Sequence, residues 1–464
     1  MKIEMKYIVI WFLLIPFMVG CTAKNDDEAK EITEEVFLRA MQDFKANRIS
    51  GDSVRKILKD SISTTFLKGW IQENQNDTAG AIQSVVGYLY AKGKGCEKDN
   101  KKSFHLYQQG AKKGIPFAMN GLGIQYNLGI GVEKNLSKAV EWFTKAAEQG
   151  DAVAQYNLAN CYYNGKGVEK NPSKAVEWYA KAAEQGNARA QDKLANCYYN
   201  GEGVAKDLSK AVEWYAKAAG QGNTHAQDML ANCYYNGEGV EKNLSKAVEW
   251  YTKAANQGLA VAQWNLAFCY AIGEGVEGNP SKAVEWWAKA AEHGEARAQY
   301  ILAYCYFNGY GTETDFYKAL EWYTKAAEHG YIDAKKNIAE ICLNKITTKK
   351  NIERGLKTIR ELALDSCYSD SQYKLGLMYE MGQHVARDDS KAFELYKSSA
   401  SQHYSPAEYR LGIFYYEGIG VKQDKRIGLL WIRNAADDGN EDAKNFLKGI
   451  KDPSSQNKPK MSLW

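Results

Sequence analysis

The chain has 464 residues, of which 45% are hydrophobic and 25% charged, a composition typical of ordinary globular proteins. A chain of this length is too long for one compact core, so it predicts several domains or an array of repeats. Its 60 basic and 56 acidic residues nearly cancel. No face collects the lysines and arginines that phosphate binding requires, which excludes a nucleic-acid partner.

Residues 1–20 have the pattern of a signal peptide. Two lysines lie within the first six residues, and the apolar run from Tyr7 to Val19 is too short to span a bilayer comfortably. The run ends in Met18-Val19-Gly20-Cys21, which resembles the lipobox of bacterial lipoproteins, although Met18 stands where leucine is usual. The resemblance implies that Cys21 is lipidated and becomes the new N-terminus, with enough acyl chains for a stable anchor. An ordinary secretory signal or an uncleaved anchor is the alternative.

Residues 21–27 then form the lipidated cysteine and a polar tether. The acidic cluster around Asp26 resembles the surface-export signal of some Bacteroidetes lipoproteins, although any polar tether has a similar composition. Thr22 after the cysteine favours the outer membrane by the same family analogy. We therefore expect a lipid-anchored protein of the bacterial cell envelope, in the outer membrane and facing either the periplasm or the surface.

From residue 79 to about residue 450 the sequence repeats itself every 36 residues, which is the signature of a repeat architecture. One cysteine column runs through Cys161, Cys197, Cys233, Cys269 and Cys305, and one tryptophan column through Trp142, Trp178, Trp214, Trp250, Trp286 and Trp322. A Gly-x-Gly pair keeps the same register. One repeat, at about 334 to 370, loses this pair and gains one residue, after which the pattern returns.

Each unit predicts two helices. The first, near Ala154 to Asn164, places its small and apolar residues on one face, and Gly165 ends it. The second begins at Asn171-Pro172, a favourable N-cap and first helical position. Its apolar stripe is rich in alanine, so the two helices can pack closely. The pattern predicts an all-α solenoid of about ten helix-turn-helix repeats.

The repeated phrase AQxxLAxCYxxGxGVxKxxSKAVEWYxKAAEQG is similar to the Sel1-like repeat, a relative of the tetratricopeptide repeat. The resemblance covers residues 79–450 and implies a right-handed superhelix whose first helices line the concave face. Residues 28–78 precede the array and predict an N-terminal helical cap, with helices at Glu28 to Lys45 and Ser53 to Gln72. Residues 451–464 are rich in Pro, Ser and Lys and predict a disordered tail.

The cysteine column predicts buried thiols. Equivalent positions in stacked repeats lie roughly 8–10 Å apart, beyond the reach of a disulfide. Some Sel1-like proteins clip each hairpin with two cysteines, but this chain has one per repeat, so that feature does not carry over. No histidine accompanies the column, and we expect no metal site.

An enzyme that hydrolyses or binds β-lactams is the alternative we weigh against a binding protein. Ser-x-x-Lys occurs at Ser53/Lys56 and Ser371/Lys374, without the Ser-Asp-Asn and Lys-Thr-Gly partners of that chemistry. The G-x-G-x-x-G at residues 273–278 is one copy of a helix–helix loop and follows no strand. We expect no catalytic residue and no cofactor.

The first helix also carries polar and aromatic residues that the apolar stripe does not use. Asn and Tyr recur in three repeats, and aromatic residues replace them in the next two. We hypothesise that this strip binds an extended peptide of the cell envelope, although recent duplication also produces such ladders. Peptidoglycan, stacked on the aromatic rings, is the rival ligand. We expect a monomer. The candidate residues are Tyr156, Asn160, Tyr163, Asn196, Tyr199, Asn232, Tyr235, Trp264, Phe268, Tyr300, Tyr304 and Phe307.

Overall fold

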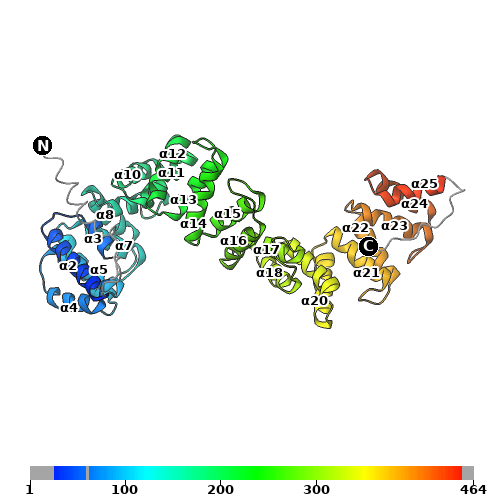
Figure 1. Ribbon diagram of the computed structural model, residues 1–464, viewed down its shortest axis with the longest axis horizontal. Helices are drawn as coiled ribbons and strands as arrows, with labels where there is room; N and C mark the ends of the chain where they lie inside the picture. Colours follow the sequence, from blue (N-terminus) through cyan, green and yellow to red (C-terminus); the bar gives the residue numbers. More distant parts are fainter. Residues whose placement is uncertain (1–25, 59–61, 452–464) are drawn as a thin grey trace. The chain divides into compact units, whose positions relative to one another are not determined.

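The computed structural model describes residues 26–58 and 62–451, and its helices are numbered from α2 (Figure 1). The described residues form α-helices and two π-helical segments and contain no strand. This confirms the all-α fold class that the sequence predicts. The predicted signal peptide, Cys21 and almost the whole predicted tail lie outside the described residues. Within the described part, no helix combines the length and the apolar character that a membrane span requires.

The chain divides into two compact units, residues 1–242 and residues 243–464, which are described separately. The helices of unit 1 are α2 (Asp26–Lys45), α3 (Gly51–Ile57), α4 (Thr64–Asn74), α5 (Gly80–Lys92), α6 (Asn100–Lys112), α7 (Pro116–Leu128), α8 (Leu136–Glu148), α9 (Ala152–Asn164), α10 (Pro172–Glu184), α11 (Ala188–Asn200), α12 (Leu208–Gly220) and α13 (Thr224–Asn236).

Unit 2 continues with the same alternation of helices. Its elements are α14 (Leu244–Asn256), α15 (Ala260–Ile272), α16 (Pro280–Glu292), α17 (Ala296–Asn308), α18 (Phe316–Glu328), α19 (Ile332–Glu340), η1 (Ile341–Lys345), α20 (Lys349–Arg360), η2 (Glu361–Asp365), α21 (Ser369–Met381), α22 (Asp389–Ala400), α23 (Ser405–Glu417), α24 (Lys425–Asp437) and α25 (Glu441–Lys451).

Helices α2, α3 and α4 precede the repeats and pack against α5 and α7. The single helix predicted from Ser53 to Gln72 is wrong, because α3 ends at Ile57 and α4 begins at Thr64. Each of the two helices has its own serine N-cap: the hydroxyl of Ser50 accepts the amide of Ser53, and that of Ser63 accepts the amide of Phe66, both at 3.3 Å.

A buried ion pair joins this N-terminal segment to the array. Arg55 on α3 donates to Asp151, the N-cap of α9, with Nη2 3.1 Å from Oδ2, and it also pairs with Asp52. The Arg55 guanidinium lies over the Phe117 ring. The two carboxylates raise the pKa of Arg55 against the opposing effect of burial, so the charged form is retained.

The repeat that contains α9 and α10 shows how the sequence forms each pair. The side chain of Asp151 accepts the amide of Ala154 at 2.8 Å, and Gly165 ends α9 with a φ of 68°. Asn171 then caps α10 by accepting the amide of Lys174 at 2.9 Å, and Pro172 occupies the first turn. The predicted two-helix unit and its caps are confirmed.

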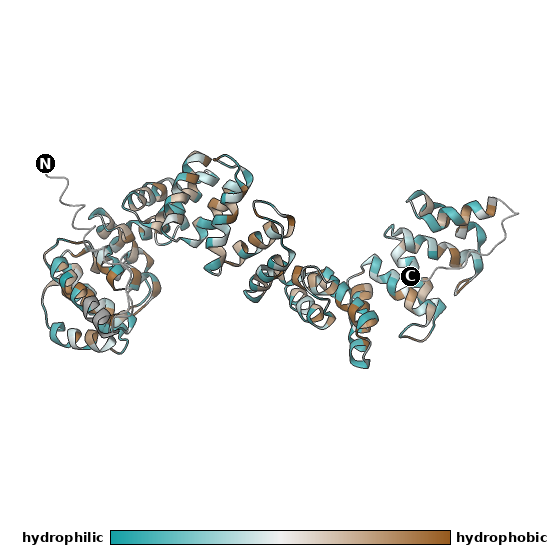
Figure 2. Ribbon diagram, in the orientation of Figure 1, coloured by the Kyte–Doolittle hydropathy of each residue, from teal (hydrophilic) through white to brown (hydrophobic). Residues whose placement is uncertain are grey.

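The contact between neighbouring helices is formed by alanines and by one aromatic position, which is Tyr179 in α10. Ala175, Tyr179, Ala182 and Ala183 on α10 are all at most 1% exposed. In most second helices of the repeats, the apolar residues lie on one side and the hydrophilic residues on the other (Figure 2). Small side chains therefore let the helices approach, and a buried ring fills the space left between them.

The second loop glycine of each pair lies against the start of the preceding second helix, as two of these glycines show. Gly203 has a φ of 75°, and a Cβ at this position would lie 2.4 Å from the carbonyl carbon of Pro172, at the start of the preceding second helix. Gly239 meets Leu208 in the same way. Both the conformation and the space therefore require glycine.

One repeat of unit 2 departs from this plan. Helix α19 continues into η1 and α20 continues into η2, so both helices of the pair end in a π-helical turn instead of a glycine cap. A π turn accommodates an extra residue, which is consistent with the one-residue insertion in this repeat. The standard pattern returns with α21, which ends at Gly382 with a φ of 65°.

Candidate functional site

We use the term first-helix columns for the positions equivalent to Tyr156, Asn160 and Tyr163 in each repeat. In unit 1 the asparagine column is engaged inside its own repeat. Asn160 accepts the hydroxyl of Tyr179 at 2.7 Å and donates to the carbonyl of Tyr156 at 3.0 Å. Asn196 makes the same two bonds, to Tyr215 at 2.8 Å and to the carbonyl of residue 192 at 2.9 Å. The amides thus orient the buried tyrosines, and their predicted pairing with a peptide stays a prediction.

The tyrosine column of unit 1 reaches the loop of the next repeat. The hydroxyl of Tyr163 donates to Glu202, and that of Tyr199 donates to Glu238 at 2.5 Å. These bonds to a carboxylate raise the pKa of both phenols to about 12. The column therefore ties successive repeats together.

The remaining unit 1 candidates are also half-buried. The Tyr156 ring lies 6.0 Å from that of Tyr179, and Asn232 donates to Asp228 at 3.3 Å. The ammonium of Lys242 lies 5.7 Å from the centre of the Tyr235 ring. The first-helix columns of unit 1 are thus polar and internally bonded.

Unit 2 replaces the Asn–Tyr pair. In the α15/α16 repeat, Phe268 stands at the asparagine position and Trp287 at the tyrosine position. Trp287 is 6% exposed and its Nε1 has no hydrogen-bond partner, because phenylalanine offers no acceptor. Trp264 packs beside it, with ring centres 6.1 Å apart. Phe268 itself is 42% exposed.

The next repeat, α17/α18, also lacks the asparagine. Tyr304 takes its place and is 49% exposed. Tyr300 beside it is held between two rings, 5.4 Å from Tyr323 and stacked 5.6 Å from Tyr331. Phe307 packs edge-on against the Phe316 ring of the second helix. Two rings of these columns are thus exposed, and the others form their support.

Exposed apolar residues are concentrated in unit 2. Among the described residues, three large exposed hydrophobic side chains lie in unit 1 and twelve in unit 2. Those on the first helices of unit 2 are Val261, Phe268, Ile272, Tyr304, Ile332 and Met381. Rings and aliphatic side chains gathered on one set of helices are typical of a binding surface.

The structure adds a pocket that the sequence analysis missed. It has a volume of about 450 Å³ and lies between α19, η1 and α21, in the repeat with the π turns. Glu340 and Leu377, which continue the Phe268/Tyr304 column, are part of its lining, together with Leu343 and Met381. The loss of Gly-x-Gly and the extra residue were the sequence signals for this site.

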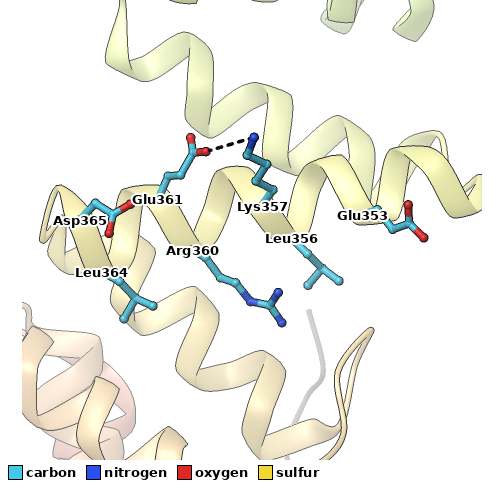
Figure 3. A pocket seen from close by; sticks show the side chains of 7 residues that line it. All are labelled: Glu353, Leu356, Lys357, Arg360, Glu361, Leu364 and Asp365. Carbon is cyan, nitrogen blue, oxygen red and sulfur yellow. Dashed lines mark ion pairs between the residues drawn. The ribbon is translucent and has the colours of Figure 1, made fainter.

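A second hollow of about 450 Å³ lies on α20 and η2 of the same repeat. All seven of its side chains come from one continuous helical segment (Figure 3). Lys357 and Glu361 pair at 3.9 Å on its edge, and Leu364 is 58% exposed. Because no second element forms a wall, we do not assign it a ligand.

The residues considered for catalysis have other partners. The Oγ of Ser53 lies 3.3 Å from the Oγ of Ser50, and Ser371, which is 1% exposed, donates to Asp370 at 3.3 Å. Neither serine is hydrogen-bonded to the lysine three residues later within the described part of the chain. The cysteine column is buried as predicted, and burial raises the pKa of the Cys161 thiol to about 11.

Stacked helix pairs with exposed aromatic residues define a helical-repeat protein. The chain belongs to the Sel1 repeat family. The family model matches residues 83–115, 116–151, 152–187, 188–223, 224–259, 260–295, 296–331, 369–404 and 405–440. Residues 332–368, which contain η1 and η2, lie between two of these matches and are left out. Sel1 repeat proteins commonly act as non-catalytic scaffolds for protein interactions.

The chain is also similar to several solved structures. A protective antigen of uropathogenic Escherichia coli with an SLR fold is 28% identical, with a TM-score of 0.66 over 94% of this chain and 92% of its own. A Sel1 repeat protein from Oxalobacter formigenes is 35% identical, covers 53% of this chain and 96% of its own, and has a TM-score of 0.48. Cysteine-rich protein B of Helicobacter pylori is 32% identical, over 28% of this chain and 92% of its own, with a TM-score of 0.24. A comparison with curated proteins returned no match.

Proposed function

We propose that this chain is a lipid-anchored scaffold of the bacterial cell envelope that binds a protein segment through the first-helix columns of unit 2. Two independent lines support the proposal. The lipobox-like sequence at Cys21 favours a membrane tether. The Sel1 repeat family supports a role in protein interactions.

One observation carries the choice of unit 2. Unit 1 keeps the polar pairs that bind its asparagines to buried tyrosines, whereas unit 2 replaces them with Phe268 and Tyr304, which are 42% and 49% exposed. Water contact with such rings is unfavourable, and burying one fully is worth about 1.5–3 kcal/mol. A partner that covers both rings would recover part of this free energy.

The geometry favours an extended peptide. Neighbouring helix pairs lie roughly 8–10 Å apart, which corresponds to about three residues of extended chain. In the extended polyproline II conformation, side chains recur on one face every three residues, about 9 Å apart, so such a peptide would meet Phe268 and Tyr304 at intervals of three residues. The half-buried Trp264 and Tyr300 rings support these contacts from the side.

The test uses a substitution that restores the pattern of unit 1. Phe268→Asn with Trp287→Tyr recreates the Asn–Tyr pair, and Tyr304→Asn gives Tyr323 an amide partner. A phage-displayed library of random peptides is selected on the chain without residues 1–20, and the Kd of the selected peptides is measured by fluorescence anisotropy. We expect the triple variant to bind at least about tenfold more weakly and to unfold at the same or a higher temperature.

Tyr317→Ala is the matched control, because Tyr317 is 69% exposed but lies on a second helix, α18. It should leave peptide affinity unchanged. Equal Kd values for the triple variant and the unaltered chain would refute the proposal. Sedimentation with purified peptidoglycan tests the rival ligand: retention that depends on Phe268 and Tyr304 would favour glycan binding.

The anchor is tested separately. Cells that express the chain are labelled with an alkyne analogue of palmitate, and the protein is recovered from the membrane fraction. Cys21→Ser should abolish both the label and the membrane association. An unlabelled protein, or one in which Cys21→Ser changes nothing, would contradict the lipoprotein assignment.

A further inference from the structure

The pocket of the π-helical repeat carries a specific chemical signature. Its lining combines the carboxylate of Glu340 with apolar groups, of which Leu343 and Met378 are mostly buried and Met381 is 49% exposed. Its volume of about 450 Å³ can take a side chain and the adjoining backbone of a ligand. An acidic group at an apolar wall is suited to a long basic side chain, whose stem is apolar and whose end is charged.

Glu340 is the unpaired acid of this pocket. It forms no ion pair with any residue in the described ranges. The nearest lysine in sequence, Lys336, is engaged elsewhere: its ammonium lies 3.2 Å from Asp370 and 3.6 Å from Asp333. Lys374 is exposed at the rim and contributes the one uncompensated positive charge of the lining.

The pocket exists because this repeat abandons the standard loop. Leu343 and Asn344 of η1 line the pocket at the positions equivalent to Phe307 and Asn308, and Lys345 follows them where the preceding repeat has the first loop glycine, Gly309. His384 closes the end of the pocket from the loop after α21: its φ is 60°, and its Nε2 donates to the carbonyl of Leu343 at 3.0 Å. Departures of this kind, a π segment and a left-handed non-glycine residue, are concentrated at functional sites.

The pocket is also in register with the aromatic surface. Phe268, Tyr304, Glu340 and Leu377 occupy the same position in four consecutive repeats of unit 2. The column therefore presents two rings, then a carboxylate, then an aliphatic group. A peptide that runs along it meets one position about every three residues.

We infer that the partner of the proposed function carries an arginine or lysine that enters this pocket and pairs with Glu340, with apolar residues about three positions before and after it. The basic stem packs on Leu377 and Met381 of the lining. The inference rests on the proposed function and specifies its ligand: an extended segment that reads apolar, basic, apolar.

The experiment is a charge exchange between protein and peptide. A peptide selected on the unaltered chain is synthesised with its central basic residue retained, replaced by Gln and replaced by Glu. Each version is titrated against the unaltered chain, Glu340→Gln and Glu340→Lys. We expect Glu340→Gln to lower the affinity for the basic peptide about tenfold and to leave the affinity for the Gln peptide unchanged. Glu340→Lys should bind the Glu peptide better than the basic one.

Lys374→Gln is the matched variant on the opposite side of the pocket. Because it removes a positive charge from the rim, it should slightly raise the affinity for the basic peptide and lower the affinity for the Glu peptide. Circular dichroism melting curves of all three variants should superimpose on that of the unaltered chain, since neither Glu340 nor Lys374 forms an ion pair within the described part of the chain.

The outcomes separate this inference from the proposed function. Peptides that lose affinity with the Phe268/Trp287/Tyr304 variant but show no basic preference, or a Glu340→Lys variant with unchanged selectivity, would overturn the inference and leave the function standing. If the peptides bind the Phe268/Trp287/Tyr304 variant as tightly as the unaltered chain, both the inference and the proposed function are overturned.

Discussion

The final repeat, α23 and α24, contains a buried acid in a position where most other repeats have glutamine. In those repeats the side-chain amide donates to a backbone carbonyl, as Gln155 does to Ala147 at 3.1 Å and Gln299 to Ala291 at 3.2 Å. Glu408 occupies this position on α23, is 1% exposed, and its Oε2 has no hydrogen-bond partner. Only a protonated Glu408 can donate the equivalent bond.

The pKa of Glu408 is raised above its ordinary value of 4.5, by burial first and then by Asp438 at the end of α24, while His403 opposes the shift. A raised pKa means that the folded chain binds this proton more tightly than the unfolded chain. The stabilisation that this bound proton gives to the folded chain is therefore complete below about pH 4.5. It is lost as the pH rises through the pKa that Glu408 has in the folded chain.

Glu408→Gln supplies the donor at every pH. At pH 8 it removes an unpaired buried acceptor, which costs about 1–3 kcal/mol, so we expect the free energy of unfolding of the final repeat to rise by about that amount. At pH 4 the difference should nearly vanish, because the protonated acid and the amide make the same bond. Hydrogen exchange of the α23 and α24 amides at both pH values measures this local stability.

Two results would refute the reasoning. A stability difference that does not change between pH 4 and pH 8 would show that Glu408 does not titrate in this range. A Glu408→Gln variant that is less stable at pH 8 would show that the carboxylate has a partner worth more than the amide bond.

Three further outcomes can be checked on the same protein. Arg55→Met should destabilise unit 1 by about 3–5 kcal/mol in urea titrations, because it leaves Asp151, whose side chain is 4% exposed, without its cation; a loss below about 1 kcal/mol would contradict this. Gly203→Ala should lower the free energy of unfolding by more than about 1 kcal/mol because the added Cβ has no space. Gly220→Ala, whose Cβ would meet nothing within 4 Å, should stabilise α12 by about 0.5–1 kcal/mol. Equal effects of the two substitutions would refute the close contact at Gly203. The exposed thiol of Cys367 should react with a disulfide reagent at pH 8 within minutes, while the buried cysteine column stays protected until the chain unfolds.

The regular part of the fold could be predicted because the sequence repeats. A cap such as Asn171-Pro172 or a stop such as Gly165 is a weak signal once, but it recurs in register and has a local physical cause. The same argument placed the cysteine column in the core. The helix break between Ile57 and Thr64 was missed because residues 28–78 occur only once and offer no second copy for comparison.

The candidate site was only partly predictable. Exposed rings at Phe268 and Tyr304 followed from a break in the repeated pattern. The partner of Asn160 did not, because Tyr179 lies on the other helix of the pair and their 2.7 Å bond depends on how the helices pack. The sequence contained one signal for this bond: in the repeat where Phe268 replaces the asparagine, Trp287 replaces the tyrosine. The pocket at Glu340 depends on a π turn, and an inserted residue could equally have lengthened a loop.

The close contact at the second loop glycine also bears on how such a chain grows. Gly203 rests on Pro172 and Gly239 on Leu208 through backbone atoms, so the junction does not depend on which side chain begins the preceding helix. Copying one 36-residue unit therefore creates a new junction of the same kind without any compensating change. The 37-residue unit with its π turns lacks this interchangeability. Because the Glu340 pocket is lined by this unit and by α21 of the next one, both units have to be copied together for the pocket to be kept.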